Sequence, residues 1–350
     1  MIIKEKQKKI LFIILEKGIS SSSVIHAEMS GLGEKISLVT VKRALSEMAE
    51  SGLLTVSGSG PSTSYDISVQ GRLFIPIDGH KFCSIEPDKR YGLNRYNFDL
   101  LPNFPKNIFE ELEIRSLKSA TAEYQLRTKN LSDVIQKKEL ERLIIELAWK
   151  SSKIEGNTYT LLDTEKLILE KKEAVGHDKN EARMILNHKD AFNFIYENKN
   201  FFQTITRANL EQLHAILVRD LNINADLRKK PVGVVGSKYQ PLDNGYQIAE
   251  AVETLGKTVS KMSSPYAKAL IALLGISYIQ PFEDGNKRTS RLMANALLLA
   301  YGLAPLSYRS VDENEYREAM LVFYEINSLI PFKKIFIEQY KFSAANYAVS

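Results

Sequence analysis

Apolar residues recur at helical spacing through most of the chain beyond residue 107, and this periodicity predicts a mainly α-helical fold. The expected helices cover 107–128, 131–150, 163–173, 179–198, 206–220, 247–261, 265–279, 286–301, 312–327 and 331–345. The segment 265–279 is apolar on nearly every side, which is typical of a helix buried in a core. We therefore expect an all-α domain over 107–350.

The first seventy residues follow a different pattern. Three helical segments precede "LTVSGSGPSTSYDIS", in which two short β-type runs flank a Gly/Ser/Pro turn. This order resembles a small α+β winged helix-turn-helix domain over 1–70. In such a domain the third helix would enter the major groove of DNA and expose four polar residues, Thr40, Lys42, Arg43 and Ser46. The same fold could instead serve protein contacts or dimerisation, and the sequence leaves both uses open.

Two segments lack a helical period. Residues 71–106 are rich in aromatic residues, Gly and Pro, and we predict a short β-containing connector with a boundary near residue 106. Residues 229–247, "KKPVGVVGSKYQPLDNGYQ", alternate β-branched residues with Gly between flanking prolines. This pattern predicts a β-hairpin between helices, and its exposed edge could pair with another extended chain.

Composition places few restrictions on function. The chain has 350 residues, of which 44% are hydrophobic and 25% charged, and its net charge is +5. Residues 1–70 carry eight cations and seven anions, so charge alone indicates no nucleic-acid partner. Cys83 is the only cysteine, which excludes an intrachain disulfide. Because the apolar runs are too short for a signal peptide or a membrane span, we expect a cytoplasmic protein with no membrane partner.

Common catalytic and nucleotide-binding motifs are missing from the sequence. It contains no GxxxxGKS/T, GxGxxG, HExxH or GxSxG motif, and its five histidines show no metal-ligand spacing.

The segment "YIQPFEDGNKRTSRLMANALLLAYG", residues 278–302, joins two expected core helices. Gly285 would let the backbone approach a ligand closely, and the free amides at the start of the next helix favour an anion. Arg288 and Arg291 would lie on one face of that helix, and Asp284 could hold magnesium against phosphates. The pattern predicts a polyphosphate site without a Walker loop; the alternative is an ordinary helix start with solvated charges.

Within this segment, "QPFEDGNKRTSR" resembles the signature of the Fic family, HPFx(D/E)GNGRxxR. The matching residues are Pro281, Phe282, Asp284, Gly285, Asn286, Arg288 and Arg291. The resemblance implies an all-α Fic core over about 130–340 and a flap hairpin at 229–247, with Val234, Val235, Gly236 and Ser237 as its site residues. It also implies transfer of AMP from ATP to a Ser, Thr or Tyr hydroxyl of a target protein docked at the flap. By the family's roles Asp284 would hold magnesium, and the nucleotide would contact Gly285, Asn286, Lys287, Arg288 and Arg291, the last at the terminal phosphate.

Upstream, "SSKIEGN" at 151–157 resembles the inhibitory motif of the family, S/TxxxEG/N, at the end of a helix expected over about 140–157. Ser151, Glu155 and Gly156 match this motif. The resemblance implies that Glu155 pairs with Arg291 and blocks productive binding of ATP, because a carboxylate there would compete with the γ-phosphate.

Two positions depart from the signature. Gln280 replaces the family histidine that takes the proton from the target hydroxyl, and Lys287 replaces the second glycine. A lysine there occurs in Doc-like relatives, which transfer a phosphoryl group. Three interpretations follow: an auto-inhibited protein adenylyltransferase whose catalysis is lost or impaired, a nucleotide-sensing DNA-binding regulator with an inactive Fic domain, and Doc-like phosphoryl transfer. A homodimer also stays open.

Overall fold

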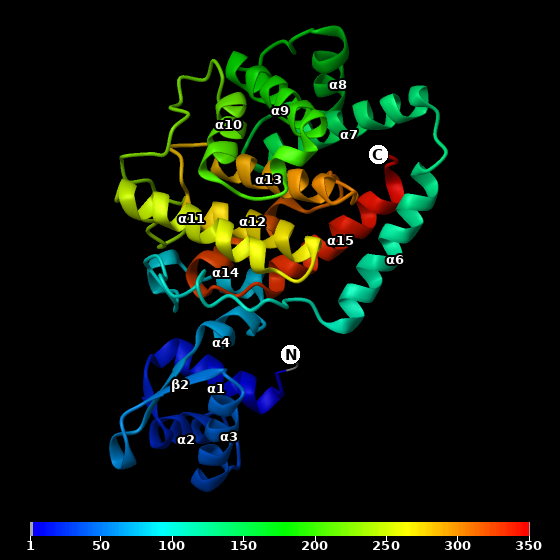
Figure 1. Ribbon diagram of the computed structural model, residues 1–350. Coiled ribbons are helices and arrows are strands. Elements are labelled where there is room, and N and C mark those ends of the chain that lie inside the picture. Colours follow the sequence, from blue (N-terminus) through cyan, green and yellow to red (C-terminus); the bar gives the residue numbers. More distant parts are fainter. Residues whose placement is uncertain (1–2, 350) are drawn as a thin grey trace. The chain divides into compact units, whose positions relative to one another are not determined.

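The computed structural model describes residues 3–349, which are mainly helical with one three-stranded sheet (Figure 1). The chain divides into two compact units. The first contains the chain up to residue 105 together with 234–239 and 318–332. The second contains 106–233, 240–317 and the chain from 333 onward. Helices α14 (Glu313–Ile326) and α15 (Ile330–Asn346) contribute residues to both units.

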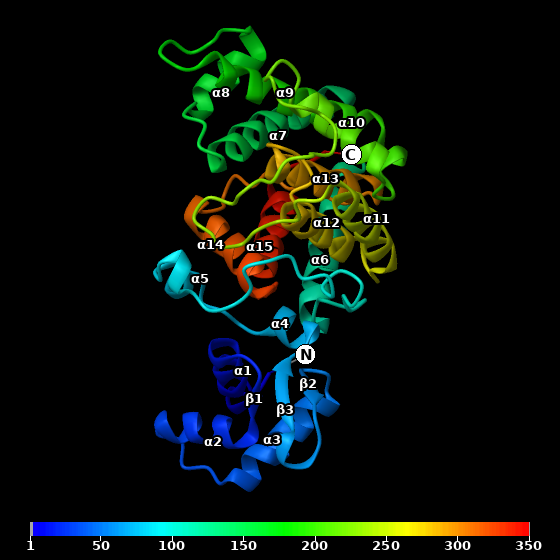
Figure 2. The ribbon, with the colours of Figure 1, turned by 90° about the vertical axis from the view of Figure 1, so that its left-hand side faces the viewer.

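The first unit begins with three helices and three strands, in the order α1 (Glu5–Lys17), β1 (Ser20–Ser21), α2 (Ser22–Gly31), α3 (Leu38–Glu50), β2 (Leu54–Ser57) and β3 (Ser64–Ile67). Both outer strands pair antiparallel with β3, in the order β1-β3-β2 (Figure 2). Ser21 and Ser37 cap α2 and α3 by accepting bonds from backbone N–H groups. Ile14, Met29 and Leu45 are buried in this part of the unit. Its assignment as a winged helix-turn-helix domain stays a prediction.

The β-containing connector predicted over 71–106 is wrong in its secondary structure, because this segment forms no strand. It contains the end of α4 (Val69–Phe74), α5 (Gly79–Cys83) and a 3₁₀ turn at Pro87–Lys89. Backbone carbonyls of this segment bond to irregular chain after α14 instead of to a strand. Leu329 N–H donates to the Leu73 carbonyl at 3.0 Å, and Ser328 Oγ donates to the Ile75 carbonyl at 2.6 Å.

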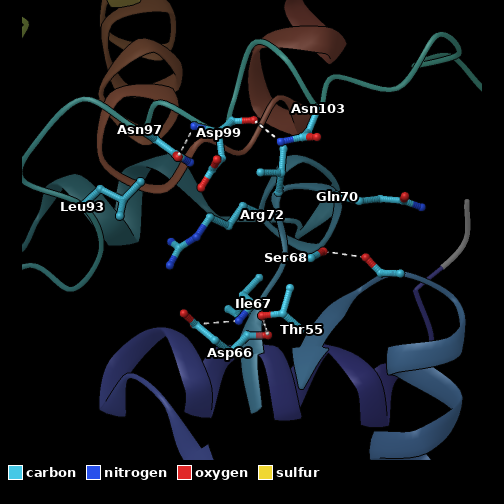
Figure 3. Close-up of a pocket in the computed structure, with 12 residues that line it drawn as sticks. Thr55, Asp66, Ile67, Ser68, Gln70, Arg72, Leu93, Asn97, Asp99 and Asn103 are labelled. Carbon is cyan, nitrogen blue, oxygen red and sulfur yellow. Dashed lines mark hydrogen bonds between the residues drawn. The ribbon is translucent and has the colours of Figure 1, made fainter. Parts of the chain in front are cut away.

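A polar pocket of about 590 Å³ lies within the first unit (Figure 3). It is lined by residues of β2, β3, α4 and the segment 93–103. In the view of Figure 3, Arg72 extends between Asp99 above it and Asp66 below it. None of its lining residues belongs to the sites predicted from the sequence.

The second unit is helical. It contains α6 (Glu111–Thr128), α7 (Asp133–Ile154), α8 (Leu161–Glu170), α9 (Lys179–Glu197), α10 (Arg207–Leu217), α11 (Gly245–Lys261), α12 (Pro265–Ile279), α13 (Asn286–Ala300) and the adjoining parts of α14 and α15. The ten helices predicted beyond residue 107 are all present, with bounds that differ from the prediction by a few residues. The family fold predicted here, an all-α Fic core, is discussed with the site below.

Helices α12 and α13 form the centre of the second unit (Figure 1). Every residue of α12 from Ala269 to Ile279 is buried, as its apolar sequence predicts. Gly275 allows the close approach of α11, because a Cβ there would lie 2.3 Å from a Leu255 methyl carbon. The hydroxyl of Ser277 donates to that of Ser290 at 2.9 Å, which joins α12 to α13. The segment between these two helices is therefore held by a rigid core.

The β-hairpin predicted over 229–247 is wrong. Residues 229–244 form an irregular segment, here called the strap, and α11 begins at Gly245. Pro231 and Pro241 supply no N–H group to a ladder. The fully buried Arg228 also takes two strap carbonyls, donating to Lys230 O at 2.8 Å and to Leu242 O. Side chains thus satisfy backbone groups that a hairpin would have paired.

Among residues 3–349, no helix combines the length and the apolar character that a membrane crossing requires.

Candidate functional site

The loop between α12 and α13 begins at Gln280, which ends α12 in the left-handed conformation (φ 51°, ψ 60°). Its backbone N–H donates to Ile276 O at 3.0 Å. The side-chain amide turns back toward the same helix, where Nε2 donates to Ser277 O at 2.6 Å, and only 7% of the residue is exposed. Arg228 holds this point from outside, since its Nε donates to Gln280 O at 2.6 Å. The side chain at position 280 is therefore closely confined.

Asn286 gives the loop its shape. Its Oδ1 accepts from Phe282 N–H at 2.8 Å, and its Nδ2 donates to Phe282 O, also at 2.8 Å. Gly285 follows with φ +76° and precedes the first turn of α13. The predicted phosphate contact of Asn286 would therefore use its backbone N–H or the second hydrogen of Nδ2, because Oδ1 and one Nδ2 hydrogen bond within the loop.

Three cations follow on α13. The side chains of Arg288 and Arg291 are 2% and 0% exposed, and that of Lys287 is 33% exposed. Asp284, whose side chain is 68% exposed, lies 3.4 Å from Arg288 Nη2. Burial is the main cause that lowers the pKa of Arg288, and the nearby charge of Asp284 opposes this shift. Buried cations at the start of a helix, where backbone N–H groups are free, form an electropositive site for an anion.

Glu155 and Arg291 form the ion pair predicted from the sequence resemblance. Arg291 Nη1 donates to Glu155 Oε1 at 2.9 Å. Ser151 binds the other side of the guanidinium, accepting from Nε through Oγ and from Nη2 through its carbonyl, both at 2.8 Å. Burial alone would raise the pKa of Glu155, but the charges of Arg291 and Lys287 outweigh it and lower that pKa. The carboxylate is therefore ionised at neutral pH.

The way in which α7 ends at its C-terminus explains the glycine of "SSKIEGN". Glu155 is the C-cap of α7, and Gly156 follows with φ +97°. Gly156 N–H donates to Lys153 O at 3.0 Å, and Asn157 N–H donates to Ser152 O at 3.1 Å. These two bonds form a Schellman motif, in which the left-handed residue is usually glycine. The motif ends the helix at Ile154 and fixes the backbone at Glu155, and with it the direction of the Glu155 side chain.

Comparison with known proteins identifies this region. Residues 204–298, which include the whole loop and most of α13, match the Fic/DOC family. The chain contains a Fic/DOC family domain. The match is narrower than the 130–340 predicted from the resemblance.

The similarity to relatives and to solved structures covers more of this chain than residues 204–298. The chain is 26% identical over 188 residues to "Protein adenylyltransferase Fic" of Nematostella vectensis, covering 52% of this chain and 44% of the relative. It is 31% identical over 185 residues to the protein of the same name from Culex quinquefasciatus, covering 51% and 36%. It therefore spans less than half the length of these curated relatives. A Fic family protein from Desulfovibrio desulfuricans G20 matches with a TM-score of 0.57 at 20% identity, over 69% of this chain and 75% of that chain. The helical unit thus has the all-α Fic fold.

His214 of the Fic domain was missed by the sequence reasoning. Its ring stacks on Phe282 with the centroids 3.6 Å apart and the planes 8° from parallel. Its Nδ1 lies 3.0 Å from Thr289 Oγ1, and a Cβ at Gly285 would come within 3.2 Å of its Cε1. It therefore supports the loop from α10. In the sequence, His214 was a single histidine within the expected helix 206–220, and no motif marked it as part of the site.

The first turn of α14 was missed as well, although it holds the end of α7. Arg317 donates to Ile154 O through Nε at 3.1 Å and also through Nη2. Glu313 accepts from Lys150, and Tyr316 OH lies 3.5 Å from Arg291 Nη1. These contacts join residues more than 20 positions apart, and no local pattern reports them. They position the segment that carries Glu155.

A magnesium ion fits this Fic domain only together with a ligand. Among residues 3–349 no group of three or more His, Cys, Asp and Glu side chains could hold a metal. Magnesium usually takes one or two carboxylates and completes its shell with waters and substrate phosphates. The exposed carboxylate of Asp284, beside the start of α13, suits that arrangement.

The remaining predicted site residues lie in the first unit. Thr40, Lys42, Arg43 and Ser46 are all exposed on α3. In the strap, Val235 is 99% exposed, and Ser237 N–H donates to Val234 O at 3.2 Å around Gly236. The predicted flap residues thus form a turn, not a hairpin.

Proposed function

We propose that the Fic domain binds ATP with magnesium at the start of α13 and belongs to the lineage that transfers AMP to hydroxyl groups of a target protein. The main observation behind this proposal is the pair of buried arginines, Arg288 and Arg291. They lie beside the backbone N–H groups at the start of α13, which follow Gly285. Polyphosphate is the anion that such a site suits. The names of the relatives, protein adenylyltransferase, support AMP as the transferred group.

The residues would divide the work as follows. Gly285 would let the phosphates approach the backbone, and Arg288 and Arg291 would neutralise their charge. Asp284 would hold the magnesium ion, which when bound would screen the phosphates. In the transfer the oxygen of the target hydroxyl bonds to the α-phosphorus, the bond from that phosphorus to the bridging oxygen breaks, and pyrophosphate leaves. The hydroxyl proton must go to a base.

Gln280 occupies the position where the family signature has that base. An amide has no useful basicity near neutral pH, and losing a positioned base costs roughly 10²- to 10⁴-fold in rate. The amide also bonds to Ser277 O, so it is directed toward α12. We infer that this chain binds nucleotide but transfers it slowly or not at all.

Glu155 would inhibit binding of the terminal phosphate. Its carboxylate lies on Arg291, the residue that the resemblance assigns to this phosphate, so carboxylate and phosphate would exclude each other.

A target protein would dock at the strap, where Val235 is fully exposed.

The experiment compares four forms of the chain: unaltered, Glu155→Gly, Gln280→His, and the double variant. Each is incubated with magnesium and ATP labelled at either the α- or the γ-phosphate. We expect the double variant to label itself from α-labelled ATP and the unaltered chain to remain unlabelled. Label from the γ-position instead would indicate Doc-like phosphoryl transfer. This reaction is an alternative because Doc-like relatives also have a lysine at the position of Lys287. No transfer by a double variant that still binds ATP would contradict the adenylyltransferase proposal.

A second function is favoured by the exposed polar face of α3. Together with Gln280, it suits a nucleotide-sensing DNA-binding regulator whose Fic domain is inactive. Binding of the chain to random duplex DNA, measured with and without ATP, tests it. Loss of binding in Lys42→Met/Arg43→Met would support this function, and no binding by the unaltered chain at low salt would exclude it.

A further inference from the structure

The carboxylate of Glu155 lies between two cations of α13. Oε1 is 2.9 Å from Arg291 Nη1, and Oε2 is 3.5 Å from Lys287 Nζ. Lys287 and Arg291 are four positions apart, so they project from the same face of the helix. Each oxygen of the carboxylate therefore faces a cation of its own.

The two cations differ in their surroundings. Arg291 is fully buried and is also held by Ser151, whereas the Lys287 side chain is 33% exposed. Within residues 3–349, the only ion pair of Lys287 is the one with Glu155. Lys287 is thus free to change partner, because little else in the described chain holds its ammonium group.

Lys287 also occupies an unfavourable place for a cation. It is the second residue of α13, whose first turn contains no acidic residue. The N-terminal end of a helix carries partial positive charge, so a lysine there is destabilising unless an anion lies nearby. Glu155 supplies that anion from α7, which gives the lysine a partner that its own helix lacks.

The electrostatics agree with this geometry. Burial would raise the pKa of Glu155, and the opposing influences are the charge of Arg291 first and that of Lys287 next. The carboxylate is therefore stabilised in its charged form by both cations and not by Arg291 alone.

We propose that Lys287 is a second latch on the inhibitory carboxylate, so that two cations of α13 hold Glu155 in the place of a nucleotide phosphate. This inference rests on the proposed function of the site. The family signature has glycine at position 287, which has no side chain to offer; a domain with that glycine would hold its glutamate by the arginine alone. The departure at Lys287 thus strengthens inhibition in this chain.

The proposal predicts a reversal of sign. While Glu155 is present, Lys287 favours the closed arrangement and opposes ATP. Once Glu155 is removed, the same ammonium group is free to attract the phosphates of ATP. Lys287→Met should therefore tighten ATP binding in the unaltered chain and fail to tighten it in Glu155→Gly.

Calorimetry with magnesium and ATP on the unaltered chain, Lys287→Met, Glu155→Gly and the double variant measures this reversal. A partly exposed ion pair contributes little, so we expect Lys287→Met alone to lower the Kd about two- to fivefold. In Glu155→Gly the same substitution should leave the Kd unchanged or raise it. Lys166→Met, which removes one exposed lysine of α8, is the charge-matched control and should leave the Kd unchanged in both backgrounds.

Weaker binding after Lys287→Met in both backgrounds would make Lys287 a phosphate ligand only, and no change in either would make the pair an incidental surface contact; both overturn the latch. Hydrogen exchange at 155–157 gives a measure that needs no nucleotide. Lys287→Met should speed exchange there, whereas Lys166→Met should not. If Glu155→Gly binds no ATP, the proposed function fails, and faster exchange in Lys287→Met would still support the latch while unchanged exchange would overturn it.

Discussion

Arg90 and Glu325, 235 positions apart in the sequence, form a buried ion pair in which Nη1 lies 3.1 Å from Oε1. Their side chains are 4% and 0% exposed. The same Nη1 donates to Gly236 O at 2.9 Å, and Ser237 Oγ donates to Glu325 Oε1 at 2.6 Å. The central turn of the strap is therefore held by a charge pair of the first unit.

Replacing Arg90 should be costly for this reason. Arg90→Met would leave the Glu325 carboxylate buried without its cation, which typically lowers the free energy of unfolding by about 3–5 kcal/mol. The strap turn would also lose a donor, so trypsin should cut after Lys238 sooner. Urea unfolding and limited proteolysis measure the two effects. Lys89→Met is the neighbouring control, because Lys89 pairs with Glu86 at 2.7 Å while both side chains are more than 70% exposed. Equal effects of the two substitutions would contradict the role of the buried pair.

The helices of the second unit could be predicted because their information is local. The apolar residues of α12 and α13 recur within each helix, and Ser264 and Gly285 mark their starts. The loop between them carried enough charge and glycine to suggest an anion site. The pairing of Glu155 with Arg291, by contrast, followed from resemblance to a family and not from periodicity.

Other features could not be predicted from local pattern. The strap looked like a hairpin because its residues favour strands, but Arg228 and Arg90 take carbonyls that a ladder would use. His214 and Arg317 act through partners on other helices, so spacing within one helix gives no sign of them. In each case a side chain contacts atoms of a residue far away in the sequence, and only the fold brings the two together.

The inhibitory pair makes a prediction about non-additive effects. Glu155→Gly should tighten binding of magnesium and ATP by roughly ten- to a hundredfold, since a charge-assisted bond to Arg291 no longer competes. Arg291→Ala should weaken binding, and the double variant should resemble Arg291→Ala, because the glutamate acts mainly through that arginine. Calorimetry on the three variants and the unaltered chain tests this, and additive changes would remove the inhibitory role of Glu155.

A buried histidine should make the stability depend on pH. His188 of α9 is fully buried, and burial, followed by the charges of Arg291 and Arg288, lowers its pKa to about 3. The unfolded chain binds a proton at this residue below about pH 6.5, whereas the folded chain does not until about pH 3. The stabilisation is therefore complete above pH 6.5 and is lost progressively as the pH falls toward 3.

His188→Gln should remove this dependence. Between pH 6 and 4 the free energy of unfolding of the unaltered chain should fall more steeply than that of the variant, by about 1.4 kcal/mol per pH unit for one proton. Urea unfolding at several pH values measures the slopes. His80→Gln, at a side chain that is 87% exposed, is the control for losing an imidazole at the surface. Equal slopes for His188→Gln and the unaltered chain would show that the buried ring takes up its proton without unfolding.

Gly285 and Gly302 offer a matched pair for the last prediction. Both have positive φ, +76° and +66°, so alanine at either position meets the left-handed cost of about 1–2 kcal/mol. A Cβ at Gly302 has nothing within 4 Å, whereas one at Gly285 would lie 3.2 Å from His214 Cε1. The His214 ring cannot move aside freely, because it stacks on Phe282 and bonds to Thr289.

Gly285→Ala should therefore destabilise the chain more than Gly302→Ala in urea unfolding. Gly285→Ala should also weaken ATP binding in the Glu155→Gly background, because the added methyl group would narrow the approach of the phosphates to the first backbone N–H groups of α13. Gly302→Ala should leave ATP binding unchanged. Equal loss of stability with full ATP binding in both variants would mean that the loop accommodates a side chain, and that close approach of phosphate to Gly285 is not required.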